Sequence, residues 1–104
     1  MSLRQNWGDK FKIGLRNYFS SDGQIEFDLV GGKNNICYIF EIKWRNKSAS
    51  YRDLERFLGK VKVSEFSFQP KKLFFIPKSF TEKALGFAQE GSIVLLDERL
   101  SVLK

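Results

Sequence analysis

Three ionisable side chains interrupt two otherwise apolar stretches of the sequence: Asp28, Glu41 and Lys43. Carboxylates are ligands that a hard divalent cation takes in proteins, and Mg²⁺ needs only one or two of them. A lysine beside such a site can orient a water molecule or stabilise the charge that develops on a phosphate. The set therefore predicts metal-assisted hydrolysis of a phosphodiester, a reaction that needs no histidine in a sequence that contains none.

The element that would position these side chains is a hairpin over residues 24–44. β-Branched and aromatic residues crowd both of its strands, and the turn at 31–35 is rich in glycine and asparagine. The two-residue period of a strand puts Glu41 and Lys43 on one face, and we expect Asp28 and Glu41 to converge at one edge of the sheet. An ordinary same-face ion pair between Glu41 and Lys43 is the alternative.

The rest of the sequence predicts an α/β domain around this hairpin. The other predicted elements are a strand over 11–19, a helix with Ser50 as N-cap, a strand over 71–77, a helix that Ser79 and Glu82 begin and Gly91 ends, and a strand over 92–96. The order β-β-β-α-β-α-β gives a mixed central sheet of about five strands flanked by helices. We expect residues 1–104 to form a single domain, the C-terminal fragment of a longer protein.

Composition narrows the class of protein. Aromatic residues make up 15% of the chain, which is enough apolar surface to build a core. The formal charge of +6 favours an anionic partner, nucleic acid before membrane, with a simple excess of lysine as the alternative. Cys37 is the single cysteine, and it fits a small buried residue of a cytoplasmic protein. No stretch approaches the roughly 20 apolar residues of a membrane span.

The helix after the hairpin carries a basic line, Arg52, Arg56 and Lys60, opposite its apolar stripe. A solvated face is the alternative to phosphate binding for this line. The cations that we select for contact with DNA are Lys33, Arg45, Lys47, Arg52 and Arg56. Trp44 can stack on a base, although a tryptophan at a strand end more often belongs to the core.

Two short motifs resemble the core of the PD-(D/E)XK nuclease superfamily, which has the restriction-endonuclease-like fold. They are E-F-D at residues 26–28 and F-E-I-K-W at residues 40–44, separated by a turn and followed by a helix. Within the superfamily, the sequence resembles the nuclease-like domains at the C-terminal end of predicted archaeal and bacterial ATPases. The likeness covers the order of elements from about residue 11 to residue 96.

The resemblance implies a Mg²⁺-dependent DNA nuclease, with Mn²⁺ as a possible substitute. Asp28 and Glu41 would bind the metal together with the backbone carbonyl of Ile42, and Lys43 would position the attacking water. Glu26 would assist them, or else be solvated or ion-paired. The partners implied are DNA and an ATPase domain in the same chain.

The sequence departs from the superfamily pattern in two places. Phe27 occupies the position of the proline that gives the superfamily its name. The superfamily usually begins with a helix that bears a further acidic residue, and no such helix precedes the predicted first strand. The alternative function is therefore a non-catalytic accessory module that binds DNA or protein and serves an ATPase. Asp28, Glu41 and Lys43 favour the enzyme, and the missing helix favours the module.

Overall fold

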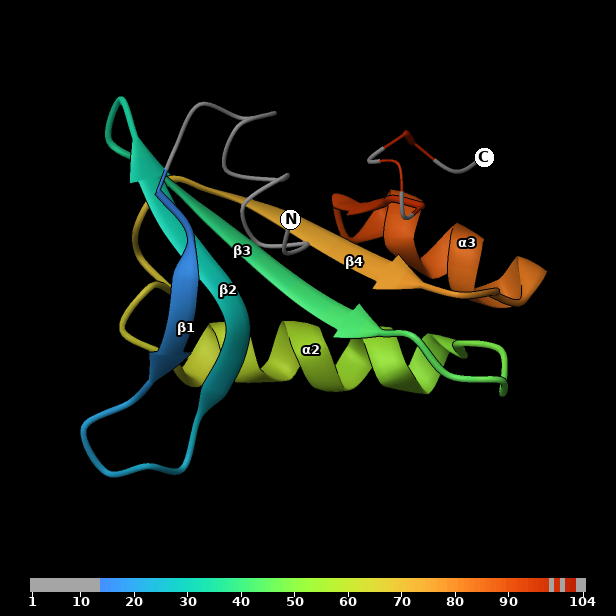
Figure 1. Ribbon diagram of the computed structural model, residues 1–104, viewed down its shortest axis with the longest axis horizontal. Coiled ribbons are helices and arrows are strands. Elements are labelled where there is room, and N and C mark those ends of the chain that lie inside the picture. Colours follow the sequence, from blue (N-terminus) through green and yellow to red (C-terminus); the bar gives the residue numbers. More distant parts are fainter. Residues whose placement is uncertain (1–13, 98, 100, 103–104) are drawn as a thin grey trace.

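The computed structural model describes residues 14–97, 99 and 101–102. Over these residues the chain forms the predicted order β-β-β-α-β-α-β around one mixed sheet (Figure 1), which confirms the fold class. The elements are β1 (Arg16–Phe19), β2 (Glu26–Lys33), β3 (Ile36–Lys43), α2 (Tyr51–Val63), β4 (Lys71–Pro77), α3 (Glu82–Glu90) and β5 (Ile93–Leu95).

The strands lie in the sheet in the order of the sequence, β1-β2-β3-β4-β5. β1, β2 and β3 are antiparallel neighbours, whereas β3, β4 and β5 run parallel. A parallel pair needs a crossover connection, and α2 and α3 supply the two crossovers. Residues 73–77 of β4 are all buried, as the uninterrupted apolar run predicts for an interior strand.

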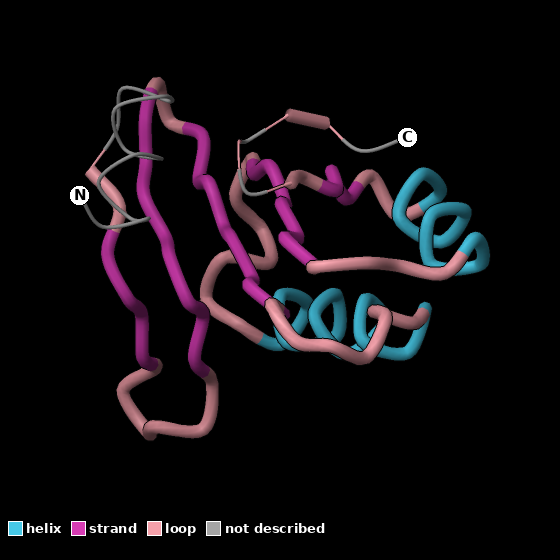
Figure 2. The backbone as a smooth tube through the Cα atoms, turned by 45° about the vertical axis from the view of Figure 1, so that its right-hand side comes forward, coloured by secondary structure: helices cyan, strands magenta, loops and turns pink. Residues whose placement is uncertain are grey.

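Both described helices pack against the same face of the sheet (Figure 2). The core on this face joins residues of the two helices to residues of the strands, among them Leu54, Phe57, Val61, Ala84, Ala88, Phe27, Ile39 and Phe75. A second apolar cluster lies on the opposite face, where Phe40 and Ile76 are fully buried beside Leu96. The sheet therefore has an apolar core on each side.

A β-bulge interrupts the pairing of β1 with β2. Arg16 lies opposite Val30 and Tyr18 lies opposite Phe27, so three residue steps of β2 match two steps of β1. Phe27 packs with the helices, whereas Leu29, two residues later, belongs to the cluster on the opposite face. The two-residue alternation assumed in the sequence analysis therefore fails in the middle of β2.

The hairpin turn is shorter than the glycine content predicts. Asn34 and Asn35 have φ angles of 54° and 65°, the left-handed values that a two-residue type I′ turn requires. Gly31 and Gly32 lie within β2. The predicted turn over 31–35 is therefore reduced to the two asparagines, which tolerate this conformation better than most residues do.

The two helices begin differently from each other. Ser50 is the N-cap of α2, as predicted, but α3 begins after Thr81, whose Oγ1 accepts a hydrogen bond from the Ala84 N–H at 3.1 Å. Ser79 instead connects the loop before α3 to the loop before α2, because its carbonyl accepts a hydrogen bond from the Ala49 N–H at 2.8 Å. The prediction of Ser79 as the helix start is therefore wrong.

The first strand is only partly covered by the structure. β1 occupies Arg16–Phe19, Gly14 and Leu15 are not in a strand, and the predicted portion at 11–13 lies outside the described residues. None of the helices described is long and apolar enough to cross a lipid bilayer.

Candidate active site

The carboxyl end of β3 places Glu41 and Lys43 beside α2. Cys37 and Ile39 point into the core under the helices, and alternation along the strand turns Glu41 to the same side. Glu41 is only 5% exposed, and Lys43, the last residue of β3, is half-buried. A carboxylate so well covered must have partners, because burying an unpaired charge is costly.

Asp28 reaches the same place from the irregular part of β2. Its Oδ2 accepts a hydrogen bond from the Ile42 N–H at 2.8 Å. On the other side of β2, Asn17 Nδ2 donates to the carbonyl oxygen of Phe27 at 3.0 Å and approaches that of Asp28 at 3.4 Å. Side chains thus satisfy backbone groups around the bulge, where the regular ladder is disrupted.

Two hollows in the surface share Glu41, Lys43 and Lys60. The larger has a volume of about 300 Å³ and the smaller about 180 Å³. The larger hollow is also lined by Gln24, Glu26, Asp28 and Ile42. The residues selected from the sequence as catalytic, metal-binding or assisting therefore gather at one hollow.

Glu41 pairs with a lysine that the sequence analysis did not select for the site. Lys60 Nζ lies 2.7 Å from Glu41 Oε2 and 2.9 Å from the Glu26 carbonyl oxygen. Desolvation raises the pKa of Glu41 and the nearby Asp28 charge adds to this, while Lys60 opposes it without restoring the ordinary value. The same-face ion pair with Lys43 is not formed, since the ion pair of Glu41 within the described chain is with Lys60.

A second buried carboxylate, Asp53, lies in the first turn of α2. Its Oδ2 accepts the Ser50 N–H at 2.8 Å and contacts Arg45 at 2.7 Å, and its Oδ1 contacts Arg56 at 3.4 Å. Burial raises the pKa of Asp53, but the Ser50 N–H and the two guanidinium groups outweigh it and hold the pKa below its usual value. Asp53 therefore anchors two arginines that we selected as DNA contacts.

The cations selected for DNA contact do not form one surface. Lys33 lies at the hairpin end of β2, five residues and roughly 17 Å along the strand from Asp28, so it is not beside the site. Lys47 and Arg52 are exposed near the start of α2. Arg56, with 76% of its side chain exposed, and Arg45, with 42%, keep exposed surface despite their contact with Asp53.

Trp44 is exposed, in contrast to the core position that strand-end tryptophans usually take. Its relative accessibility is 47%, and it directly follows Lys43. The core interpretation of Trp44 is therefore wrong. An exposed indole one residue after Lys43 is accessible to a stacking base.

Lys60 and Asp53 are the two residues of this region whose roles were missed. Lys60 stood in the basic line of the helix, for which a solvated face was the alternative, and Asp53 was recognisable only as an acidic residue in a first helical turn. The partners of Lys60 lie on β2 and β3, and those of Asp53 lie on the loop before the helix and, for Arg56, on α2 itself. The helical spacing shows which residues share a face of α2, but not which strand that face covers.

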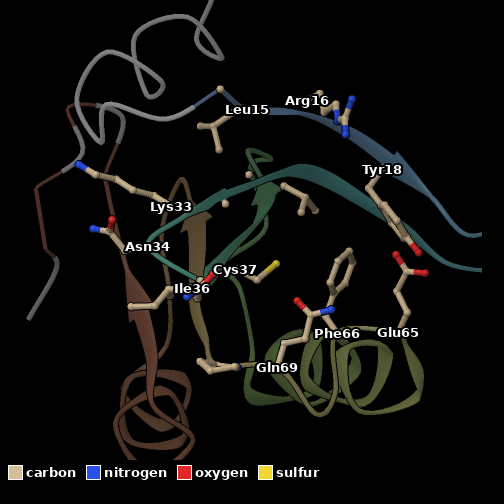
Figure 3. Close-up of a pocket in the computed structure, with 16 residues that line it drawn as sticks. Leu15, Arg16, Tyr18, Lys33, Asn34, Ile36, Cys37, Glu65, Phe66 and Gln69 are labelled. Carbon is tan, nitrogen blue, oxygen red and sulfur yellow. The ribbon is translucent and has the colours of Figure 1, made fainter.

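A larger hollow of about 850 Å³ lies at the opposite end of β2 and β3 (Figure 3). Lys33 and Cys37 are among its lining residues, and the Tyr18 hydroxyl points to the Glu65 carboxylate. The cavity includes none of the residues proposed for chemistry at the carboxyl end of β3. Burial raises the pKa of the Cys37 thiol, as expected for an unreactive interior cysteine.

The donors at the smaller site fit Mg²⁺ by their chemistry. Asp28 and Glu41 offer carboxylate oxygens at one hollow, which is the number of protein carboxylates that Mg²⁺ commonly uses while it keeps several waters. Within the described part of the chain, no group of three or more acidic or cysteine residues gathers that could hold a metal by itself. The residues thus fit an open site, completed by water and substrate, rather than a closed cage.

Comparison with known proteins gives the fold. No protein-family model matches the sequence, and no curated protein matches it. Among solved structures, AF1548, a protein of unknown function, superposes with a TM-score of 0.71 at 14% identity, over 91% of this chain and 57% of that one. A repair endonuclease from Pyrococcus abyssi superposes with a TM-score of 0.54 at 14% identity, over 88% of this chain and 43% of that one.

These likenesses show the fold alone, because the identities are low. The chain spans about half the length of the two proteins it resembles. It shares the fold of part of a repair endonuclease.

Proposed function

We propose that this domain is a Mg²⁺-dependent DNA nuclease of the PD-(D/E)XK superfamily. The observation that carries the proposal is the convergence of Asp28, Glu41 and Lys43 at one hollow on a nuclease-like fold. Of the two carboxylates, Glu41 pairs with Lys60 and Asp28 accepts the Ile42 N–H, so both are fixed at the hollow before any metal binds.

In the proposed reaction, Asp28, Glu41 and the carbonyl of Ile42 hold the metal. Mg²⁺ supplies Lewis acidity toward the phosphodiester when it is bound. The hydrogen bond from the Ile42 N–H fixes the Asp28 carboxylate before substrate arrives. Lys43 donates hydrogen bonds that orient the attacking water and stabilise the negative charge on phosphate oxygens as the P–O bond breaks. Glu26 assists at the rim, where its Oε2 is 3.2 Å from Asn17 Nδ2.

DNA binding in this proposal uses exposed groups around the hollow. Lys47, Arg52 and Arg56 are exposed and supply phosphate contacts, while Trp44 stacks on a base. Lys33 contributes only if the duplex extends along the sheet to the hairpin. We further propose an ATPase domain in the same polypeptide, on the basis of the sequence resemblance. We also propose a cytoplasmic location, on the basis of the single cysteine in the sequence.

The test is cleavage of plasmid and branched DNA by the purified domain with Mg²⁺ or Mn²⁺. We expect cleavage that chelation abolishes and that Asp28→Asn and Lys43→Ala each reduce by about 10²-fold or more. Lys62→Ala, which changes an exposed lysine on α2, is the control. Full cleavage by Lys43→Ala would show that the site is assigned wrongly, and no cleavage together with no metal binding would overturn the nuclease.

One contact favours the second candidate, a non-catalytic module that binds DNA or protein. The Lys60 ammonium neutralises Glu41, one of the two carboxylates that the metal needs. In a module of this kind, the acidic site would be a permanent ion pair. DNA binding that is independent of metal and unaffected by Asp28→Asn, without cleavage, would support this candidate.

A further inference from the structure

We infer that Lys60 is an internal cationic occupant of the metal site, and that a divalent cation must displace its ammonium group from Glu41 in order to bind. The inference rests on the proposed function, because it concerns the same carboxylates. It gives Lys60 a role that differs from that of Lys43: Lys60 sets how tightly the site binds metal, and so acts as a positioning residue and not as a catalytic one.

The ammonium of Lys60 occupies a place built from oxygen atoms. It contacts Glu41 Oε2 at 2.7 Å and the Glu26 carbonyl oxygen at 2.9 Å, and it lies 5.2 Å from the centre of the Phe27 ring. A carboxylate and a backbone carbonyl are also the ligand types that Mg²⁺ takes. The ammonium therefore holds oxygen atoms that would otherwise be open to a metal.

The contacts of Lys60 separate it from the rest of the basic line on α2. Its side chain is 33% exposed, compared with 76% for Arg56 one helical turn earlier. Arg56 contacts Asp53, and Arg52 lies near the Tyr51 ring. Of these three, Lys60 is the one that forms an ion pair with Glu41 near the end of β3. The interpretation of this line as a solvated face therefore fails at Lys60.

Charge explains why the ammonium and a metal exclude each other. Glu26, Asp28 and Glu41 line this hollow with three negative charges, and Lys43 and Lys60 line it with two positive charges. A divalent cation bound at Glu41 with Lys60 still in place would lie beside an ammonium at close range, where like charges repel strongly in a partly buried site. Lys60 has a flexible stem and a third of its side chain in solvent, so it has a route by which to leave.

The experiment measures binding of Mn²⁺ and Mg²⁺ alone, without DNA, by calorimetry and by thermal unfolding. The variants are Lys60→Met, which removes the charge and keeps much of the stem, and Lys62→Met, an exposed control two residues away on the same helix. We expect Lys60→Met to bind Mn²⁺ roughly tenfold more tightly than the wild type, the equivalent of losing one moderate ion pair. Lys62→Met should bind as the wild type does.

Thermal unfolding supplies a second readout that needs no activity. Without metal, Lys60→Met should melt below the wild type, because Glu41 loses its counter-charge. Added Mn²⁺ should raise the melting temperature of Lys60→Met more than that of the wild type, by linkage between binding and folding. Should Lys60→Met not fold, Lys60→Gln retains a hydrogen-bond donor for the Glu26 carbonyl and replaces it in both measurements.

The outcomes separate this inference from the proposed function. Equal or weaker Mn²⁺ binding by Lys60→Met, with binding in both proteins abolished by Asp28→Asn, overturns the inference and leaves the metal site intact. Absence of Mn²⁺ and Mg²⁺ binding in the wild type, Lys60→Met and Lys60→Gln overturns both. Tighter binding that Asp28→Asn removes supports both.

Discussion

Glu41 and Asp53 are equally buried carboxylates, each 5% exposed and each with a cation at 2.7 Å, yet their pKa values shift in opposite directions. Desolvation raises both pKa values. At Asp53 a backbone N–H and two arginines outweigh desolvation, whereas at Glu41 Lys60 and, more weakly, Lys43 do not, and Asp28 adds repulsion. Asp53 has the partners of a structural anchor. Glu41 keeps a raised pKa that its partners do not compensate, and such perturbed pKa values are typical of functional sites.

The largest expected effect of a substitution in this comparison is that of Asp53→Asn. It removes a charge that joins the Ser50 N–H to two arginines, so we expect a loss of about 2–3 kcal/mol in the free energy of unfolding at neutral pH. Urea unfolding of the variant beside the wild type measures it. An unchanged midpoint would mean that Asp53 is not an anchor.

The pH dependence of that loss tests its electrostatic cause. Because the pKa of Asp53 is lower in the folded than in the unfolded state, its contribution is present above the unfolded value of about 3.9 and disappears as the pH falls through the folded value. The difference between wild type and Asp53→Asn should therefore shrink in acid. A constant difference would assign the loss to packing.

Arg45→Ala should have a smaller effect, about 1 kcal/mol. Its guanidinium makes the short contact to Asp53, but 42% of the side chain is exposed and water screens the pair. The same urea unfolding experiment applies, with Lys47→Ala as an exposed control on the same loop. A loss as large as that of Asp53→Asn would show that Arg45 alone accounts for the anchor.

Glu41→Gln should differ from these in sign. The folded-state pKa of Glu41 is raised, so its favourable contribution exists below the unfolded value of about 4.3 and is lost as the pH rises through the folded value. At neutral pH the amide should therefore match the wild type or gain up to about 1 kcal/mol, as replacements at functional sites often do. A loss comparable with that of Asp53→Asn would erase the contrast between the two carboxylates.

Arg56→Ala should have the smallest effect, about 0.5 kcal/mol or less. Its contact with Asp53 is 3.4 Å long and its side chain is largely exposed. If Arg56 contacts a DNA phosphate, the affinity for DNA, measured by fluorescence anisotropy, should fall although the free energy of unfolding hardly changes. A change in stability without a change in affinity would place Arg56 with the structural anchor.

Sequence patterns predicted the order of elements because apolar periodicity and turn residues are local signals. The run at 73–76, the Ser50 cap and the Gly91 stop all act within a few residues of themselves. The same patterns predicted that Asp28, Glu41 and Lys43 lie at the same end of the sheet, where the three residues line one hollow. The functional roles of these three residues stay a prediction.

What the patterns missed depends on contacts between distant elements. The Lys60–Glu41 ion pair joins residues 19 apart in the sequence. It depends on how α2 packs against β3 in the folded chain. The start of α3 after Thr81 likewise depends on contacts between loops: Ser79 contacts Ser48 and Ala49, and Thr81 contacts Ala49. The bulge in β2 has no local sign, since one additional strand-compatible residue leaves the composition of a strand unchanged.

The bulge also determines which length changes β2 can tolerate. Deletion of one residue between Phe27 and Val30 would leave two steps on each strand, so the pairs Tyr18–Phe27 and Arg16–Val30 can both persist in a regular ladder, with Phe27 and Val30 still on the helix side. Deletion of Asp28 should therefore spare the pairing of β1 with β2 and remove the carboxylate that accepts the Ile42 N–H.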